Sequence, residues 1–169
     1  MSQEEFTAYF AARSGLVRRS AYVLCGDWHA ADDLAQEAFI RLAGSWHRMR
    51  DPAAVDAYMR TCLVRSYLRE QRRSWRRHED TVGDLPDAPD AAGLEDDRLQ
   101  RLALVRALRS VPPRQRAALV CRYLWDLDVA DTARILGCST GTVKSQTARA
   151  LDHLKAAGWE RLTSDEGAP

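Results

Sequence analysis

The chain of 169 residues has no long hydrophobic run. No stretch approaches the roughly 18 uncharged apolar residues that a membrane-spanning helix requires. The first 15 residues are acidic and have no apolar core, which argues against a secretory signal peptide. We therefore expect a protein of the cytoplasm without a membrane partner.

Residue types that build metal or catalytic centres are sparse. The four cysteines include no C-x-x-C pair and none lies beside a histidine at zinc-ligand spacing. The four histidines lie singly, and no Ser/His/Asp set, paired-carboxylate pattern or phosphate-binding Gly-rich loop is present. We expect no catalytic residues, no metal and no cofactor, so an enzyme is the weaker interpretation.

Signals for β-strands are also missing. β-Branched residues are dispersed, and no alternating apolar and polar run is bounded by hairpin turns. The patterned segments instead place apolar residues at helical spacing, which predicts an all-α fold. The expected helices cover residues 6–25, divided near Gly15, and residues 30–46, 53–77, 99–108, 114–124, 129–136 and 140 onward.

The formal net charge is +1, but a strongly basic segment of the chain is followed by a strongly acidic one. Residues 41–78 contain ten arginines against three carboxylates, whereas residues 79–97 contain eight carboxylates and no Lys or Arg. The second segment also holds two prolines and almost no large apolar residues, so it cannot bury enough surface to offset chain entropy. We predict two small helical domains, residues 1–78 and 98–156, joined by a flexible acidic linker over 79–97 and followed by a tail.

The predicted helix over residues 30–46 has a buried apolar stripe and an acidic opposite face. The acidic face consists of Asp32, Asp33, Gln36 and Glu37. These side chains could stabilise the positive end of the helix dipole. They could equally form a docking face for a basic partner, and the pattern leaves both explanations open.

The later half of the predicted helix over 53–77 is rich in arginine, with aromatic residues interleaved. Arginine neutralises phosphate, and aromatic faces stack on unpaired bases, so this mixture suits a nucleic acid. A solvated charged helix is the alternative, but such a helix normally alternates in sign. Here Glu70 is the one acidic residue among six arginines. The arginines are Arg65, Arg69, Arg72, Arg73, Arg76 and Arg77.

Residues 128–154 predict two helices joined by a tight turn. Asp128 and Ser139 suit helix N-caps, and Gly137 suits a left-handed C-terminal cap. This is the helix-turn-helix arrangement, whose second helix enters the DNA major groove. An αα-hairpin buried in an interaction protein is the alternative.

The helical wheel of this second helix separates an apolar arc from a polar one. The apolar arc contains Val143, Thr147, Ala150, Leu151 and Leu154. On the opposite side, Lys144 or Arg149 could bond guanine and Gln146 could bond adenine, while Ser and Thr serve bases or phosphate. The predicted reading residues are Ser139, Thr140, Thr142, Lys144, Ser145, Gln146 and Arg149.

Three segments in this order resemble a known family. They are DDLAQEAFIRLAGSW (32–46), DAYMRTCLVRSYLREQRRSWRR (56–77) and SVPPRQRAALVCRYLWDLDVADTARILGCSTGTVKSQTARAL (110–151). Together with the hydrophilic linker, they are similar to bacterial sigma-70 family RNA polymerase sigma factors of the extracytoplasmic-function group, in particular the SigE-like members. The resemblance covers nearly the whole chain and implies a transcription initiation factor that binds core RNA polymerase and directs it to promoters.

The resemblance also implies roles for individual residues. Asp32, Asp33, Gln36 and Glu37 would dock on the clamp helices of the β′ subunit, and the β subunit and an anti-sigma factor are further implied partners. Residues 139–149 would read the −35 element. The residues implied at the melted −10 element are Arg48, Arg50, Tyr58, Arg65, Tyr67, Arg69, Arg72, Arg73, Trp75 and Arg76.

One alternative function remains at this stage. A helix-turn-helix transcriptional regulator that binds duplex DNA without polymerase would share residues 128–154. Such a regulator would need neither the acidic helix nor the distant arginine-rich helix.

Overall fold

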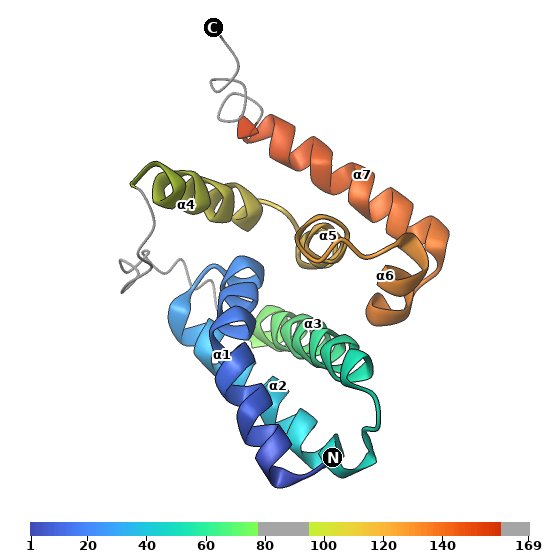
Figure 1. Cartoon of the computed structure of the whole chain (residues 1–169). Coiled ribbons are helices and arrows are strands. Elements are labelled where there is room, and N and C mark those ends of the chain that lie inside the picture. Colours follow the sequence, from blue (N-terminus) through green and yellow to red (C-terminus); the bar gives the residue numbers. More distant parts are fainter. Residues whose placement is uncertain (78–94, 160–169) are drawn as a thin grey trace, which may run out of the picture. The chain divides into compact units, whose positions relative to one another are not determined.

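The computed structural model describes residues 1–77 and 95–159, with the backbone alone for residues 95–101. All the regular secondary structure of these residues is helical, which confirms the predicted all-α fold (Figure 1). The chain divides into two compact units, Met1–Asp84 and Leu85–Pro169. Within the described ranges, no helix is both long enough and apolar enough to cross a membrane.

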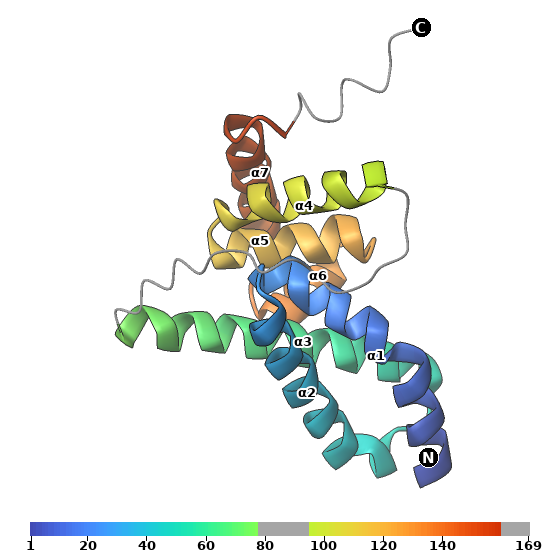
Figure 2. The same ribbon diagram turned by 90° about the vertical axis from the view of Figure 1, so that its left-hand side faces the viewer.

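Unit 1 is built from long helices. It contains α1 (Gln3–Cys25), α2 (Trp28–Ser45), the 3₁₀ turn η1 (Trp46–Arg48) and α3 (Pro52–Arg77). Helix α2 packs against both α1 and α3, and α1 also contacts α3. Figures 1 and 2 show α3 crossing the other two helices.

The core of unit 1 forms where the apolar faces of these helices meet. Leu24 of α1, Leu42 of α2 and Leu63 of α3 are each at most 1% exposed. Burying a leucine side chain stabilises a fold by about 1.5–3 kcal/mol. The predicted apolar stripe of α2 is confirmed, because Leu34, Ala35, Ala38, Phe39 and Leu42 are all buried.

The predicted division near Gly15 is wrong, since α1 runs unbroken through this residue. A glycine inside a helix costs about 0.5–1 kcal/mol relative to alanine. That cost is small beside the burial of Val17, Ala21 and Leu24 in the turns that follow. Helix α1 ends instead at Gly26, which has the left-handed conformation (φ 74°).

Unit 2 contains shorter helices. They are α4 (Glu95–Arg109), α5 (Pro113–Leu119), the π-helical turn η2 (Val120–Leu124), α6 (Val129–Leu136) and α7 (Thr140–Ala156). Helices α5, α6 and α7 all contact one another. Helix α4 starts within the predicted linker, whose residues 79–94 lie outside the described residues, as do residues 160–169 of the predicted tail.

The π-helical turn changes which side chains are buried. The helical spacing of residues 114–124 predicts Leu124 in the core, but this side chain is 50% exposed, next to Tyr123 at 63%. In the turn the Trp125 amide bonds the Val120 carbonyl at 3.0 Å, five residues back. This wider repeat alters the angular spacing of the side chains, so the regular helical spacing no longer predicts their burial.

Two arginines of α5 bond to the carboxyl-terminal ends of neighbouring helices. Carbonyls in the last turn of a helix have no partner within that helix. Arg114 donates to the Leu136 carbonyl at 3.1 Å, at the end of α6. Arg116, only 8% exposed, donates to the carbonyls of Arg109 and Val111 at the end of α4, both at 3.0 Å. These bonds fasten α4 and α6 to α5.

Two glycine substitutions should affect stability with opposite signs. Gly137→Ala is expected to lower the free energy of unfolding by about 1 kcal/mol or more, since alanine is strained at φ 63°. Gly15→Ala is expected to raise it by roughly 0.5–1 kcal/mol. The added methyl would meet only the Arg19 guanidinium, at 3.6 Å. Urea unfolding followed by circular dichroism measures both changes, and equal signs would contradict this account.

Candidate protein-docking and nucleic-acid interfaces

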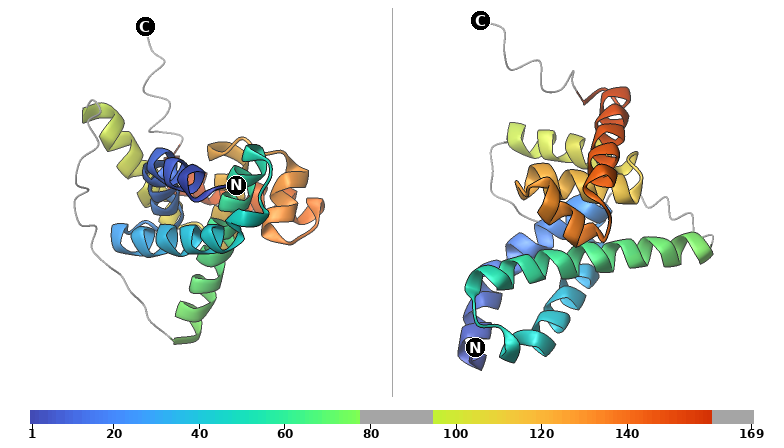
Figure 3. Two further views of the ribbon diagram at one scale, coloured as in Figure 1. Left: turned by 60° about the horizontal axis from the view of Figure 1, so that its bottom comes forward. Right: turned by 90° about the vertical axis from the view of Figure 1, so that its right-hand side faces the viewer.

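The helix-turn-helix has the caps that the sequence predicts. Asp128 accepts a hydrogen bond from the Asp131 amide at 2.7 Å and caps α6. Helix α6 ends at Gly137, which is left-handed with φ 63°. Ser139 accepts from the Thr142 amide at 3.1 Å and caps α7. Figure 3 shows α6, in orange, leading through this short turn into α7, in red.

Helix α7 presents a polar face to solvent. Of the predicted apolar arc, Val143 and Ala150 are fully buried and Leu154 is 7% exposed, whereas Thr147 and Leu151 are half-buried. On the outward side, Lys144 and Arg149 are exposed and Gln146 is half-buried, and the side chains of these three residues make no hydrogen bond or ion pair with another described residue. Within unit 2 the face is therefore uncovered, unlike a buried αα-hairpin.

The hydroxyl residues at the start of α7 are partly engaged. The Ser139 and Thr142 hydroxyls lie 2.9 Å apart, and the Ser145 hydroxyl donates to the Thr142 carbonyl at 3.0 Å. Thr140 is exposed. The seven predicted residues thus lie together at the amino-terminal half of α7, where amide groups of the first turn also favour a phosphate.

The second half of α3 carries an exposed basic and aromatic surface. Trp75 is 84% exposed, the most exposed of the large hydrophobic side chains in the described residues. Arg77 pairs with Glu70 at 3.5 Å. The exposed arginines in this half of α3 are Arg65, Arg72, Arg73, Arg76 and Arg77.

Some of the residues predicted at the −10 element are engaged inside unit 1, among them Tyr67, Tyr58 and Arg69. Tyr67 is 1% exposed, so its ring is in the core and cannot stack on a base in this conformation. It lies on the inner side of α3 together with Leu63 and Val64. The Tyr58 hydroxyl bonds the Ser45 hydroxyl at 3.0 Å. Arg69 forms an ion pair with Glu37.

Glu37 connects the acidic face of α2 with the arginine-rich helix. Its carboxylate accepts hydrogen bonds from Arg41, at 3.0 Å, and from Arg69 of α3. Partial burial by itself raises the pKa of the Glu37 carboxyl, but the hydrogen bonds from the two arginines outweigh burial and hold that pKa below its usual value. Glu37 is therefore charged and already paired.

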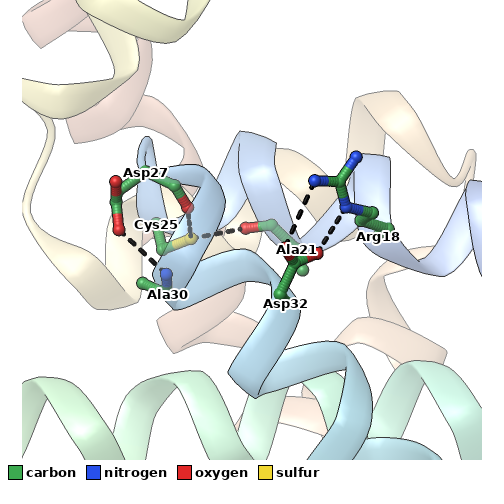
Figure 4. Close-up of polar contacts among 6 residues, drawn as sticks. All are labelled: Arg18, Ala21, Cys25, Asp27, Ala30 and Asp32. Carbon is green, nitrogen blue, oxygen red and sulfur yellow. Dashed lines mark hydrogen bonds and ion pairs between the residues drawn. The ribbon is translucent and has the colours of Figure 1, made fainter. Parts of the chain in front are cut away.

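Asp32 is paired in a similar way. Arg18 of α1 donates to both carboxylate oxygens, with its Nη2 at 3.2 Å from Oδ2 (Figure 4). The same guanidinium lies 4.4 Å from the centre of the Trp28 ring. The hydrogen bond from Arg18 is the main cause that lowers the pKa of the Asp32 carboxyl. Asp33 and Gln36 are exposed and have no hydrogen-bond or ion-pair partner among the described residues.

The helix-dipole explanation of this acidic face is excluded by where α2 starts. The N-cap is Asp27, whose carboxylate accepts from the Ala30 amide at 2.8 Å (Figure 4). The first turn of α2 contains no acidic side chain. Because the dipole effect fades beyond that turn, the acidic residues from Asp32 onward lie too far along the helix.

A groove of about 480 Å³ lies between α1 and α2 beside the acidic face. Its lining includes Phe6, Phe10, Phe39 and Ile40, together with Gln36. Phe10 is 45% exposed and Ile40 is 64% exposed. The apolar spacing of residues 6–25 predicts Phe10 in the core, whereas this side chain lines the groove; no sequence pattern above pointed to Ile40. The sequence did hold a signal for this surface, because Ile40 follows Gln36 by four residues and is therefore an apolar residue on the polar face of the helix.

The described residues contain no metal centre. They bring together no group of three or more His, Cys, Asp or Glu side chains that could hold an ion. All four cysteines are free thiols, and the Cys25 thiol lies 3.0 Å from the Ala21 carbonyl (Figure 4).

Comparison with known proteins decides the family. Residues 9–77 match Sigma-70 region 2, and residues 101–154 match Sigma-70, region 4. RNA polymerase sigma-E factor of Streptomyces coelicolor is 34% identical over 151 residues, which cover 89% of this chain and 84% of that protein. The chain belongs to the extracytoplasmic-function group of sigma-70 family sigma factors. Within this group it is SigE-like.

Other relatives agree with this family. ECF RNA polymerase sigma factor SigM of Mycobacterium tuberculosis is 38% identical over 73% of this chain and 62% of that protein. The sigma factor RpoE, solved in complex with the anti-sigma factor NepR from Bartonella quintana, shares the fold. It has a TM-score of 0.72 and 21% identity, and the match covers 91% of this chain and 96% of that one.

Family membership establishes the general function. A sigma factor is a non-enzymatic transcription initiation factor, and this one binds RNA polymerase and directs it to promoters. Unit 1 contains region 2, and the helix-turn-helix of region 4 in unit 2 binds DNA. The alternative of a regulator that acts without polymerase is therefore wrong.

Acidification should weaken unit 1 through Asp32 and Glu37. Both carboxyls have a lowered pKa in the folded unit, so their ion pairs stabilise it above the unfolded pKa and are lost as the pH falls through the folded pKa. The variant Asp32→Asn/Glu37→Gln should lose less stability than the wild type between about pH 5 and pH 2. The free energy of unfolding as a function of pH measures this difference.

Asp33→Asn is the matched control, since the Asp33 carboxylate has no ion pair with another described residue. Its pH profile should follow that of the wild type. A double variant with the same profile as Asp33→Asn would show that the two ion pairs do not stabilise unit 1.

Proposed function

We propose that the two units divide promoter recognition. Unit 2 reads the −35 element with α7, while unit 1 docks on core polymerase through α2 and holds the −10 element with α3. The observation that carries this proposal is that unit 1 exposes an acidic face on α2 and an arginine-rich face on α3. DNA would bind only the second face, so the first requires a protein partner.

The docking face consists of Asp33, Gln36 and the groove between α1 and α2. A basic side chain of the partner would pair with Asp33, and an apolar side chain would cover Phe10 and Ile40. The family resemblance points to the β′ clamp helices as this partner and adds the β subunit as a second contact. Asp32 and Glu37 belong to the same face, but here they bond Arg18, Arg41 and Arg69. A basic partner would therefore compete with these arginines.

Helix α7 would read the −35 element in the major groove. Lys144 and Arg149 can bond guanine, and Gln146 can bond adenine with two hydrogen bonds. Ser139, Thr140, Thr142 and Ser145 lie near the amino terminus of α7 and can contact phosphate. The three longer polar side chains would supply specificity, and the hydroxyl residues would supply positioning.

The exposed surface of α3 would hold the unpaired −10 strand. Arginines neutralise its phosphates, and the Trp75 ring offers a platform for a base. The free energy for unpairing would come from these contacts and from the bound polymerase, with no nucleotide hydrolysis. The proposed −10 residues are Arg48, Arg50, Tyr58, Arg65, Arg69, Arg72, Arg73, Trp75 and Arg76, without the buried Tyr67.

An anti-sigma factor is a further proposed partner. The structural relative RpoE was solved with the anti-sigma factor NepR. A similar partner that covered Asp33 and the groove of this chain would block polymerase docking. We further propose domains over residues 1–78 and 95–156, with an acidic linker over 79–94, because α4 already starts at Glu95 and not at residue 98. We propose a tail over residues 157–169 and a cytoplasmic location, where bacterial transcription takes place.

Reconstitution tests the proposed division directly. Purified chain and core polymerase would first select promoter DNA from a randomised pool, and initiation on the selected DNA would be compared with core alone. A wild-type holoenzyme that selects conserved −35 and −10 sequences supports the proposal. Selection of a single element would contradict it.

Variants of the two units should affect −35 recognition and affinity for core polymerase separately. Arg149→Ala or Lys144→Ala is expected to weaken recognition of the selected −35 duplex by about 1–3 kcal/mol, without changing affinity for core polymerase. Asp33→Arg should lower the affinity for core, because it places a like charge against a basic partner. Fluorescence anisotropy measures both affinities, and an equal loss of core binding in all three variants would overturn the division.

The exposed ring of Trp75 should affect binding of unpaired DNA. Trp75→Ala is expected to weaken holoenzyme binding to the selected −10 single strand by about 1–3 kcal/mol, because a stacking surface is removed. Trp75→Phe should retain part of that affinity. Tyr123→Ala is the control, since Tyr123 is also exposed, at 63%, and lies outside the proposed −10 surface. Equal effects of Trp75→Ala and Tyr123→Ala would contradict base stacking on Trp75.

A further inference from the structure

The short connection between α2 and α3 is anchored to the amino terminus of the chain. Trp46, the first residue of η1, is 5% exposed. Its indole N–H donates to the Ser2 carbonyl at 2.7 Å. Figure 3 shows the connection, in cyan, at the same end of unit 1 as the amino terminus. The start of the connection is therefore fixed by a residue 44 positions earlier.

Two aromatic rings of α1 complete this anchor. The Phe6 ring meets the Trp46 ring edge-on, with centroids 5.2 Å apart, and the Tyr9 ring lies 5.7 Å from it. Tyr9 is itself held, because its hydroxyl donates to Asp56 of α3 at 2.9 Å. Arg13 donates to the same carboxylate at 3.1 Å. The Trp46 ring therefore packs against a part of α1 that is itself hydrogen-bonded to α3.

The other side of the connection is held by polar contacts. Arg48 donates to the Ser45 hydroxyl at 3.3 Å, and this hydroxyl also bonds Tyr58 of α3. The Asp51 carboxylate accepts from the Ala53 amide at 2.9 Å at the start of α3. Only residues 49–51 lie between η1 and α3. Arg48 and Arg50 are thus exposed on a connection fixed at both ends.

We propose that Trp46 is a positioning residue for base recognition by this connection. Its buried indole does not touch DNA, but it sets where η1 starts and so where Arg48 and Arg50 meet the unpaired −10 strand. Selective contact with one base requires side chains held within a few tenths of an ångström, which a loosely attached loop does not provide. This inference rests on the −10 role of unit 1 proposed above.

The test compares base discrimination by reconstituted holoenzymes. The probes are fork DNAs that carry the −10 strand selected by the wild-type holoenzyme, or that strand with one unpaired base replaced. Trp46→Phe keeps an aromatic ring but removes the hydrogen bond to Ser2, so it should reduce the ratio of the two affinities about 2- to 10-fold. Phe6→Leu replaces the ring that meets Trp46 with a smaller apolar side chain but keeps the Trp46 hydrogen bond to Ser2, so it should reduce the ratio in the same direction by less.

Leu24→Val is the control for a general loss of stability. Leu24 is fully buried in α1, so this variant should lower the unfolding temperature yet keep the wild-type ratio. An unchanged ratio in Trp46→Phe and Phe6→Leu would overturn the inference, as would an equal decrease in all three variants. The proposed function would survive either result, because neither concerns whether the wild-type holoenzyme selects a −10 sequence. The remaining possible result is a wild-type holoenzyme that selects no −10 sequence. That last result would overturn both.

Discussion

The packing of α2 between α1 and α3 is the contact on which unit 1 depends. Leu34, Ala38 and Leu42 form a buried stripe on α2. With this stripe inside, the opposite side of α2 must face solvent, and Asp33, Gln36 and Ile40 are exposed there. The groove beside them is formed jointly by α1 and α2. The same buried stripe therefore positions the acidic face that we propose for docking and orients α3, which carries the arginines.

Charge within unit 1 is partly neutralised by the chain itself. Arg18 pairs with Asp32, and Arg41 and Arg69 pair with Glu37. These pairs are substantially exposed, and exposed ion pairs contribute little net stability, roughly 0–1 kcal/mol. A basic partner can therefore replace one of these arginines at small cost. Since Arg69 lies on α3, replacement at Glu37 would release a cation to the surface proposed for DNA.

Local signals in the sequence were sufficient for the helices and for the helix-turn-helix caps. Asp128, Gly137 and Ser139 act through side chains and backbone angles within a few residues, so their roles follow from spacing alone. The predictions that failed concern features that depend on packing between residues far apart in the sequence. The apolar contacts of α1 outweigh the intrinsic cost of Gly15, and Tyr67 points into the core because α3 turns that side toward its neighbours. A π-helical turn, which the spacing does not reveal, exposes Leu124.

The sequence by itself determined the all-α class, the two regions and the polar face of α7, because helical periodicity and capping are encoded by residues near one another. Only the tertiary structure decided which charged side chains are unpaired. Arg18 and Asp32 lie 14 positions apart, and Arg69 and Glu37 lie 32 apart, yet each pair is in contact. The Trp46 indole reaches Ser2 across 44 positions. Such contacts exist only after the helices pack, and no spacing along the chain specifies them.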